Sequence, residues 1–131
     1  MTTHSHDPDA PLYSPENLAR KDEVSADAFG ALDLRAGRVV AVEEFPEARK
    51  PAYKLTVDFG FAVGRLNTSA QLTNYRPDEL MDRLVVGAIN LGTKRIAGFT
   101  SECLVLGSFD ADGTVRLLAL EGSVEPGAPI G

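Results

Sequence analysis

The chain has 131 residues, a single cysteine, no tryptophan and a formal net charge of −6. This length fits one globular domain, and we expect no membrane insertion because no apolar run approaches the roughly 18 residues of a membrane-spanning helix. The lone cysteine excludes an internal disulfide and fits a reducing cytoplasm. The acidic balance argues against bulk attraction to nucleic acid or to an anionic membrane.

The acidic excess is concentrated near the N-terminus. Residues 1–28 hold 6 acidic and 2 basic side chains, which leaves 13 acidic and 11 basic side chains in the rest of the chain. Prolines among polar residues, with little periodicity, predict a flexible acidic extension over residues 1–24. Residues 25–131 are then one folded domain, close enough to neutral to carry a local basic patch.

Strand-like periodicity begins after a short helix. The stretch "SADAFGAL" predicts that helix, with Ser25 as its N-cap. "LRAGRVVAV" reads as a strand in which Gly37 suggests a bulge or sharp bend. "YKLTVDF" alternates cleanly, so Leu55, Val57 and Phe59 are expected to face the core.

The third strand, "RLNTSAQLT", carries an unusual row of uncharged polar side chains. Alternation directs Thr68 and Leu72 inward and leaves Asn67, Ser69 and Gln71 outward. Amides and hydroxyls are easier to satisfy than charges in a partly buried contact. The row therefore suits a ligand groove or the contact with a dimer mate, although small polar residues on a solvated sheet can also satisfy one another.

The remaining elements complete the outline of a small barrel. "RPDELMDR" predicts a short helix with Pro77 at its first position, and "LVVGAIN", "ECLVLGSF" and "TVRLLAL" predict further strands. "DADG", residues 110–113, predicts the turn before the last of them. Five or six short strands with a helix after the third predict an all-β OB-fold barrel with short helices, whose ligand face is built largely from strands two and three.

Three blocks resemble one known family closely. "EEFPEARKPAYKLTVDFG", "TSAQLTNYRPDEL" and "KRIAGFTSECLVLG" resemble the CsaA family, small stand-alone tRNA-binding-domain proteins that are also described as secretion-related chaperones. The resemblance runs from about Phe29 to Gly131. It implies an OB-fold tRNA-binding domain and a homodimer whose terminal segments help to join the two barrels. It also implies binding of tRNA and of unfolded or export-destined polypeptides, without catalysis.

The same resemblance indicates the residues that bind. In similar tRNA-binding domains, positions in "NLGTKRIAGFTSE" line the nucleic-acid groove, and they correspond here to Asn90, Lys94, Arg95, Ser101 and Glu102. Lysine and arginine neutralise phosphates, while asparagine and serine donate to phosphate oxygens or ribose hydroxyls. The alternative is that Lys94 and Arg95 are ordinary loop charges and that Asn90 caps a turn.

A second basic segment lies between the first two strands. "EEFPEARKPAYK" runs from acidic to basic residues and ends in a stretch that includes Arg49 and Lys50. Loops at this place in OB folds commonly clamp ligands. The alternative is a rigid surface turn stiffened by Pro46 and Pro51.

Two departures from the family pattern bear on function. Leu66 and Asn67 stand where the family often has a basic or amide pair, which weakens the case for tRNA affinity. Gly92 and Thr93 stand where it often has two prolines, which loosens the loop before Lys94.

From the resemblance we predict a tRNA-binding protein of the CsaA type that also acts as an export-related chaperone. The alternative is a polypeptide-binding secretion chaperone with weak or absent tRNA affinity.

The sequence offers little for catalysis. Both histidines, His4 and His6, lie in the extension, so the body has no triad and no histidine acid–base pair. A disordered tail explains "HSHD" better than a metal site does, and Cys103 reads as inert packing in an apolar strand. Phe61 and Phe99 lie beside glycines and could stack a base if exposed, although core packing is the commoner role. We expect a cytoplasmic, non-catalytic protein without metal or cofactor.

Overall fold

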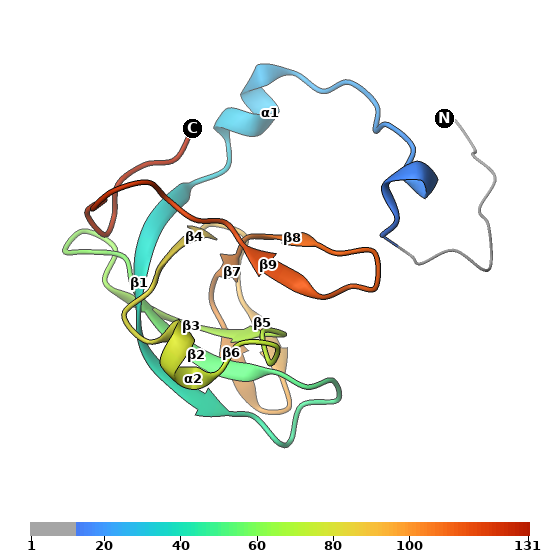
Figure 1. The fold of residues 1–131 in the computed structure, drawn as a ribbon. Coiled ribbons are helices and arrows are strands. Elements are labelled where there is room, and N and C mark those ends of the chain that lie inside the picture. The colour runs from blue at the N-terminus through green and yellow to red at the C-terminus, as the bar shows by residue number, and fades with distance from the viewer. Residues whose placement is uncertain (1–12) are drawn as a thin grey trace.

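The computed structural model of the protein describes residues 13–131 (Figure 1). Over this range the elements are short and mostly extended. They are the 3-10 helix η1 (Pro15–Asn17), α1 (Ala26–Gly30), β1 (Leu34–Glu44), β2 (Tyr53–Asp58), β3 (Arg65–Ala70), α2 (Pro77–Leu80), β4 (Leu84–Ala88), β5 (Lys94–Ile96), β6 (Phe99–Ser101), β7 (Leu104–Val105), β8 (Gly107–Phe109) and β9 (Val115–Leu117).

Five of these strands form one antiparallel sheet in the order β3-β2-β1-β4-β7. The sheet curls into a nearly closed barrel, and α2 follows β3 as the sequence predicts (Figure 1). The predicted OB-fold barrel is therefore confirmed. Two hairpins, β5–β6 and β8–β9, stand outside the sheet.

The second half of the chain differs from the prediction in two places. Lys94 and Arg95, expected in a loop, begin β5 and pair with Ser101 and Thr100 of β6. Residues 102–109, expected as one strand, divide at Leu106: β7 pairs with β4, whereas β8 pairs with β9. A short apolar run does not reveal where one strand ends and the next begins with a new partner, because hydrophobic periodicity does not predict which strands pair.

The barrel core centres on Phe59. Leu55, Val57 and Phe59 are buried as predicted, with exposed fractions of 1%, 0% and 0%. The Phe59 ring lies against two glycines: an added Cβ would come within 2.7 Å of it at Gly37 and at Gly87. These glycines allow an aromatic ring to lie directly on the backbone of β1 and β4.

The predicted bulge at Gly37 is misplaced. The irregularity in the β1–β2 ladder falls between Val39 and Ala41, while Gly37 itself pairs regularly with Val85 of β4. At Val39 the backbone N–H donates to the Arg83 oxygen at 3.0 Å, so β1 bonds here to the segment after α2. Gly37 is needed for close packing rather than for a bend.

Side chains help to close the barrel between β3 and the segment that follows β6. The Asn67 N–H donates to the Glu102 carboxylate at 2.9 Å, and the Glu102 N–H returns a bond to the Asn67 oxygen at 2.7 Å. Thr68 is 2% exposed, and its hydroxyl donates to the Cys103 oxygen at 2.7 Å. The inward Thr68 side chain and the main chain of Asn67 therefore both serve the closure of the barrel.

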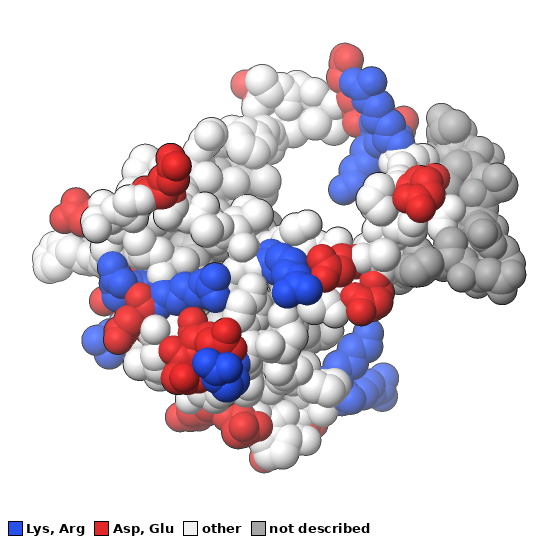
Figure 2. Space-filling view, in the orientation of Figure 1, with Lys and Arg blue, Asp and Glu red and all other residues white. Residues whose placement is uncertain are grey.

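The N-terminal segment leaves the barrel as an arch. Residues 18–32 are all exposed, and the chain from η1 to α1 runs away from the sheet (Figure 1), with open space beneath it in Figure 2. Ser25 caps α1 as predicted, since its hydroxyl accepts from the Ala28 N–H at 3.3 Å. Among the described residues no helix is long and apolar enough to cross a membrane.

Candidate nucleic-acid interface

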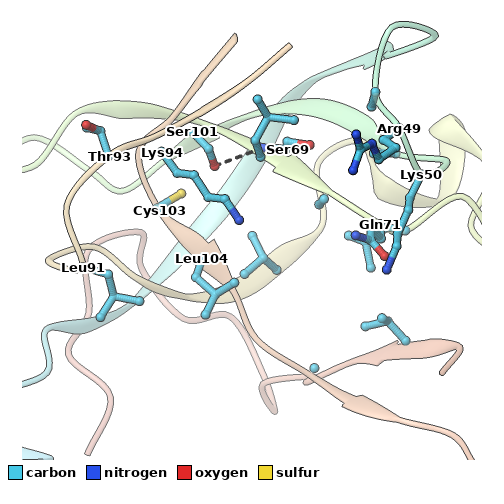
Figure 3. Close-up of a pocket in the computed structure, with 18 of the residues that line it drawn as sticks. Arg49, Lys50, Ser69, Gln71, Leu91, Thr93, Lys94, Ser101, Cys103 and Leu104 are labelled. Carbon is cyan, nitrogen blue, oxygen red and sulfur yellow. Dashed lines mark hydrogen bonds between the residues drawn. The ribbon is translucent and has the colours of Figure 1, made fainter. Parts of the chain in front are cut away.

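A groove of about 820 Å³ opens beside the barrel. Its walls come from the β1–β2 loop, the end of β3, the segment from Leu91 through β5, and the β7–β9 region (Figure 3). Most of the predicted site residues line it: Arg49, Lys50, Ser69, Gln71, Lys94, Arg95 and Ser101. In Figure 3, Arg49, Lys50 and Gln71 gather at one end, whereas Lys94, Ser69 and Ser101 lie farther along.

The groove is positively charged although the protein is acidic. Of the residues that the structure describes, no aspartate or glutamate lines it, whereas four basic side chains do: Arg49, Lys50, Lys94 and Arg95. None of the four forms an ion pair with any residue that the structure describes. Within the described part of the chain, the one side-chain hydrogen bond of Arg95 is to a neutral group, the Thr100 hydroxyl, at 2.8 Å. Outside the groove, three arginines form ion pairs among the described residues: Arg35, Arg76 and Arg116, the last with Asp110 at 2.9 Å. Figure 2 shows both signs interspersed on the face it draws. Unpaired cations in a concave site favour an anionic ligand.

The hydroxyls within the groove are partly committed to the fold. The Ser101 Oγ accepts from the Ser69 N–H at 3.3 Å, the bond drawn dashed in Figure 3. It also lies 3.2 Å from the Thr68 hydroxyl. Gln71 is exposed and forms no side-chain hydrogen bond among the described residues, so its amide is free for a ligand.

Three predicted site residues do not line the groove. Asn90 joins the segment before β1 to β4: its Oδ1 accepts from the Asp33 N–H and its Nδ2 donates to the Ala31 oxygen, each at 2.8 Å. Asn67 accepts from the Thr56 hydroxyl at 3.1 Å and pairs with Glu102 as described above. The structure gives these side chains contacts that hold the fold together.

The sequence did not indicate the apolar and aromatic part of the groove. Leu91 and Leu104 line it with exposed fractions of 55% and 51%. Tyr13 and Phe109 also line it, and Tyr13 comes from the segment that the sequence assigns to the extension. Nothing in the sequence links residue 13 to residue 109, because stacking between distant segments leaves no periodic pattern.

Two rings and a cation anchor the hairpin that carries Lys94. The rings of Phe45 and Phe99 meet edge-on with centroids 5.6 Å apart, and the Lys54 Nζ lies 4.9 Å and 5.4 Å from their centroids. Phe99 is therefore a packing residue on β6. Phe61, by contrast, is fully exposed on the β2–β3 connection.

Cys103 lies at the bottom of the groove with an exposed fraction of 8%. Burial raises the pKa of its thiol to about 11, which outweighs the opposing hydrogen bond from Thr68. A thiol with this pKa is protonated at neutral pH and is a poor nucleophile. The described residues contain no cluster of three metal-binding side chains, and "HSHD" lies outside the described residues.

Comparison with known proteins shows which family the barrel belongs to. Residues 34–129 match the family model of the putative tRNA binding domain, within the predicted domain 25–131. The chain belongs to the tRNA-binding domain family. The match begins at the first residue of β1 and includes every strand, but it leaves out the arch.

Two solved structures of CsaA chaperones are similar to this chain in sequence and in fold. A CsaA chaperone from Picrophilus torridus is 44% identical, covers 83% of this chain and 100% of its own, and superposes with a TM-score of 0.79. A CsaA chaperone from Bacillus anthracis is 41% identical, with coverage of 84% and 100% and a TM-score of 0.79. The resemblance to CsaA that the sequence predicts is confirmed.

Sequence relatives include much longer enzymes. The methionine–tRNA ligase of Thermotoga maritima is 31% identical over 112 residues, which is 86% of this chain and 17% of the ligase. The chain therefore spans only a small part of the curated ligases it matches.

Proposed function

We propose that this tRNA-binding domain binds tRNA in the basic groove and catalyses no reaction. The observation that carries the proposal is the set of four cations that line the groove, in a chain of net charge −6. Within residues 13–131 no carboxylate lines the groove and none of the four cations is ion-paired. Phosphate contacts supply most of the affinity of a sequence-independent nucleic-acid interface. Ser69, Gln71 and Ser101 add donors for phosphate or ribose oxygens.

The groove residues divide into two groups. One group neutralises the phosphates of the tRNA backbone: Arg49, Lys50, Lys94 and Arg95. The neutral side chains at the end of β3 orient that backbone. Asn67, Asn90 and Glu102 have structural partners, so the proposal depends on the residues that line the groove.

A titration of labelled bulk tRNA at several salt concentrations tests the proposal. Because each phosphate contact releases counterions, wild-type affinity is expected to fall steeply with salt. The Lys94→Ala, Arg95→Ala double variant is expected to weaken binding and to shallow the slope of log K against log [salt] by about 1 to 2.

The chain offers a matched control for this titration. Arg20 and Lys21 are also adjacent and exposed, but they lie on the arch outside the groove. Arg20→Ala with Lys21→Ala removes the same charge and is expected to keep the wild-type slope. The proposal fails if wild-type protein binds no tRNA at low salt, or if both double variants change the slope equally.

An export-related chaperone activity is a second candidate, supported by the apolar part of the groove. Leu91 and Leu104 are half exposed there, and two neighbours in structure are CsaA chaperones. An extended apolar peptide would bury these side chains, and its affinity would change little with salt. Such binding without any tRNA signal would favour this function.

We also propose a cytoplasmic homodimer joined through the arch. Leu18, Val24, Phe29 and Leu32 are exposed by 57%, 72%, 54% and 41% on a segment that touches little of its own barrel. Exposed apolar side chains gathered on one segment mark a contact with another molecule. A dimer would present two grooves to one tRNA and raise affinity without new contacts.

A further inference from the structure

An aromatic pair built from the extension and the β8–β9 hairpin lies at the edge of the groove. The rings of Tyr13 and Phe109 stack with centroids 4.6 Å apart and an interplanar angle of 12°. The Tyr13 N–H donates to the Ala111 oxygen at 3.2 Å, which fixes residue 13 to the β8–β9 turn. A Cβ built on Gly113 would lie 3.7 Å from the Tyr13 ring, in ordinary contact with it.

The two rings line the groove as well as packing against each other. Tyr13 and Phe109 are the two aromatic residues among the groove's lining residues. Phe109 remains 52% exposed although one ring already stacks on it. A ring that served only to anchor the extension would lie away from the groove or be covered.

The surroundings of the pair favour a nucleobase. The groove holds the cations Arg49, Lys50, Lys94 and Arg95, and no carboxylate from residues 13–131 lines it. A positively charged groove that follows a backbone, together with aromatic side chains on which bases stack, is the shared design of single-strand binders. Every base has a flat π-face, so this contact needs no particular sequence.

We propose that Tyr13 and Phe109 form a stacking platform for an unpaired base of an RNA whose backbone lies along the four cations. The proposal rests on the proposed tRNA binding and adds the site at which an unstacked base is held. It also makes part of the N-terminal extension a component of the groove. The family model covers only residues 34–129, so Tyr13 is an addition of this chain to the matched domain.

A tryptophan at position 13 reports directly on the platform. The protein has no tryptophan, so Tyr13→Trp adds a single indole whose emission is quenched when a base stacks on it. We would titrate this variant with a short single-stranded oligoadenylate and with tRNA. A matched variant, Phe61→Trp, places the indole at a fully exposed site outside the groove. Saturable quenching at position 13 and none at position 61 is the expected result.

Affinity measurements separate stacking from charge. Tyr13→Ala and Phe109→Ala are each expected to weaken tRNA binding by about fivefold or more, the range of one lost base stack. The salt slope is expected to stay at its wild-type value, because no phosphate contact is removed. Tyr13→Phe keeps the ring and is expected to bind as wild type, and circular dichroism checks that each variant is folded.

Each outcome decides one proposal. If wild-type protein binds tRNA with a steep salt slope while Tyr13→Ala and Phe109→Ala bind equally well, the platform is wrong and the proposed function stands. If oligoadenylate quenches the indole but tRNA does not bind, the platform stands and the tRNA function fails. If an apolar peptide quenches the indole and neither RNA does, the platform belongs to a polypeptide and this inference is overturned.

Discussion

Cys103 has its chemistry set by burial beneath the groove. The thiol pKa is raised to about 11 from an ordinary value of 9.0, chiefly because burial disfavours the thiolate. The unfolded chain therefore loses this proton at lower pH than the folded chain. The contribution to stability is complete below pH 9 and is lost as pH rises toward 11.

We predict that replacing Cys103 makes stability less sensitive to alkali. Between pH 8 and pH 11 the free energy of unfolding of the wild type should fall by roughly 2 kcal/mol more than that of Cys103→Ala, the linkage expected for a shift of this size. Urea unfolding at several pH values measures both curves, and the other titrating groups are shared by the two proteins. Parallel curves would show that the thiol titrates alike in both states.

Gly37 shows what the sequence can and cannot predict about a single residue. Its place within a β-branched strand suggests a bulge or sharp bend. In the structure, a Cβ at Gly37 would lie 2.6 Å from a Val57 methyl and 2.7 Å from the Phe59 ring. The expected bulge at Gly37 was wrong, and the glycine is needed because the ring of Phe59, the residue after β2, occupies the space beside it. Local patterns predict which residue is special, whereas the cause depends on a distant neighbour.

The elements that alternate strictly were predictable, and those that change partner were not. The inward row of β2 and the polar row of β3 follow from period two alone. The hairpin β5–β6 and the division between β7 and β8 depend on which strand lies alongside, as with Leu106, whose N–H donates to the Val86 oxygen at 2.8 Å. The same limit applies to the groove. Lys94 and Arg95 were expected from the family resemblance, and Arg49 and Lys50 from the place of their loop in OB folds. The aromatic pair, by contrast, joins segments that share no sequence pattern.

We predict that the hairpin β5–β6 depends on the contact between Phe99, Phe45 and Lys54. Phe99→Ala removes an edge-on ring contact and one face for the Lys54 cation, together about 1 to 2 kcal/mol. Backbone amides of β5 and β6 should then exchange hydrogen faster, while those of β8 and β9 should keep their rates. Phe61→Ala removes an equal but fully exposed ring and should change neither hairpin. Unchanged exchange in β5–β6 after Phe99→Ala would mean that the ring cluster does not hold the hairpin.

Charge is distributed unevenly over the whole molecule, between an acidic N-terminal segment and a barrel that carries the basic groove. The first 28 residues hold 6 of the 19 acidic side chains, so the barrel that carries the basic groove is close to neutral. An RNA bound in the groove would be attracted by the four cations and repelled by the acidic extension. The proposed dimer would set where the extension lies relative to the groove. An arch that contacts a second barrel would carry its acidic residues toward that partner.

The proposed dimer can be tested on the intact chain. We predict that sedimentation equilibrium of the wild type gives twice the chain mass of 14.0 kDa, because the exposed side chains of the arch are buried between two copies. Phe29→Asp with Leu32→Asp places charges on that apolar segment and should yield the monomer mass, since an unpaired charge is costly to bury. Phe61→Asp introduces the same kind of charge at an exposed ring off the arch and should leave the dimer intact. A wild type that remains monomeric at tens of micromolar would remove the arch as an interface, and the two-groove account of tRNA affinity would fall with it.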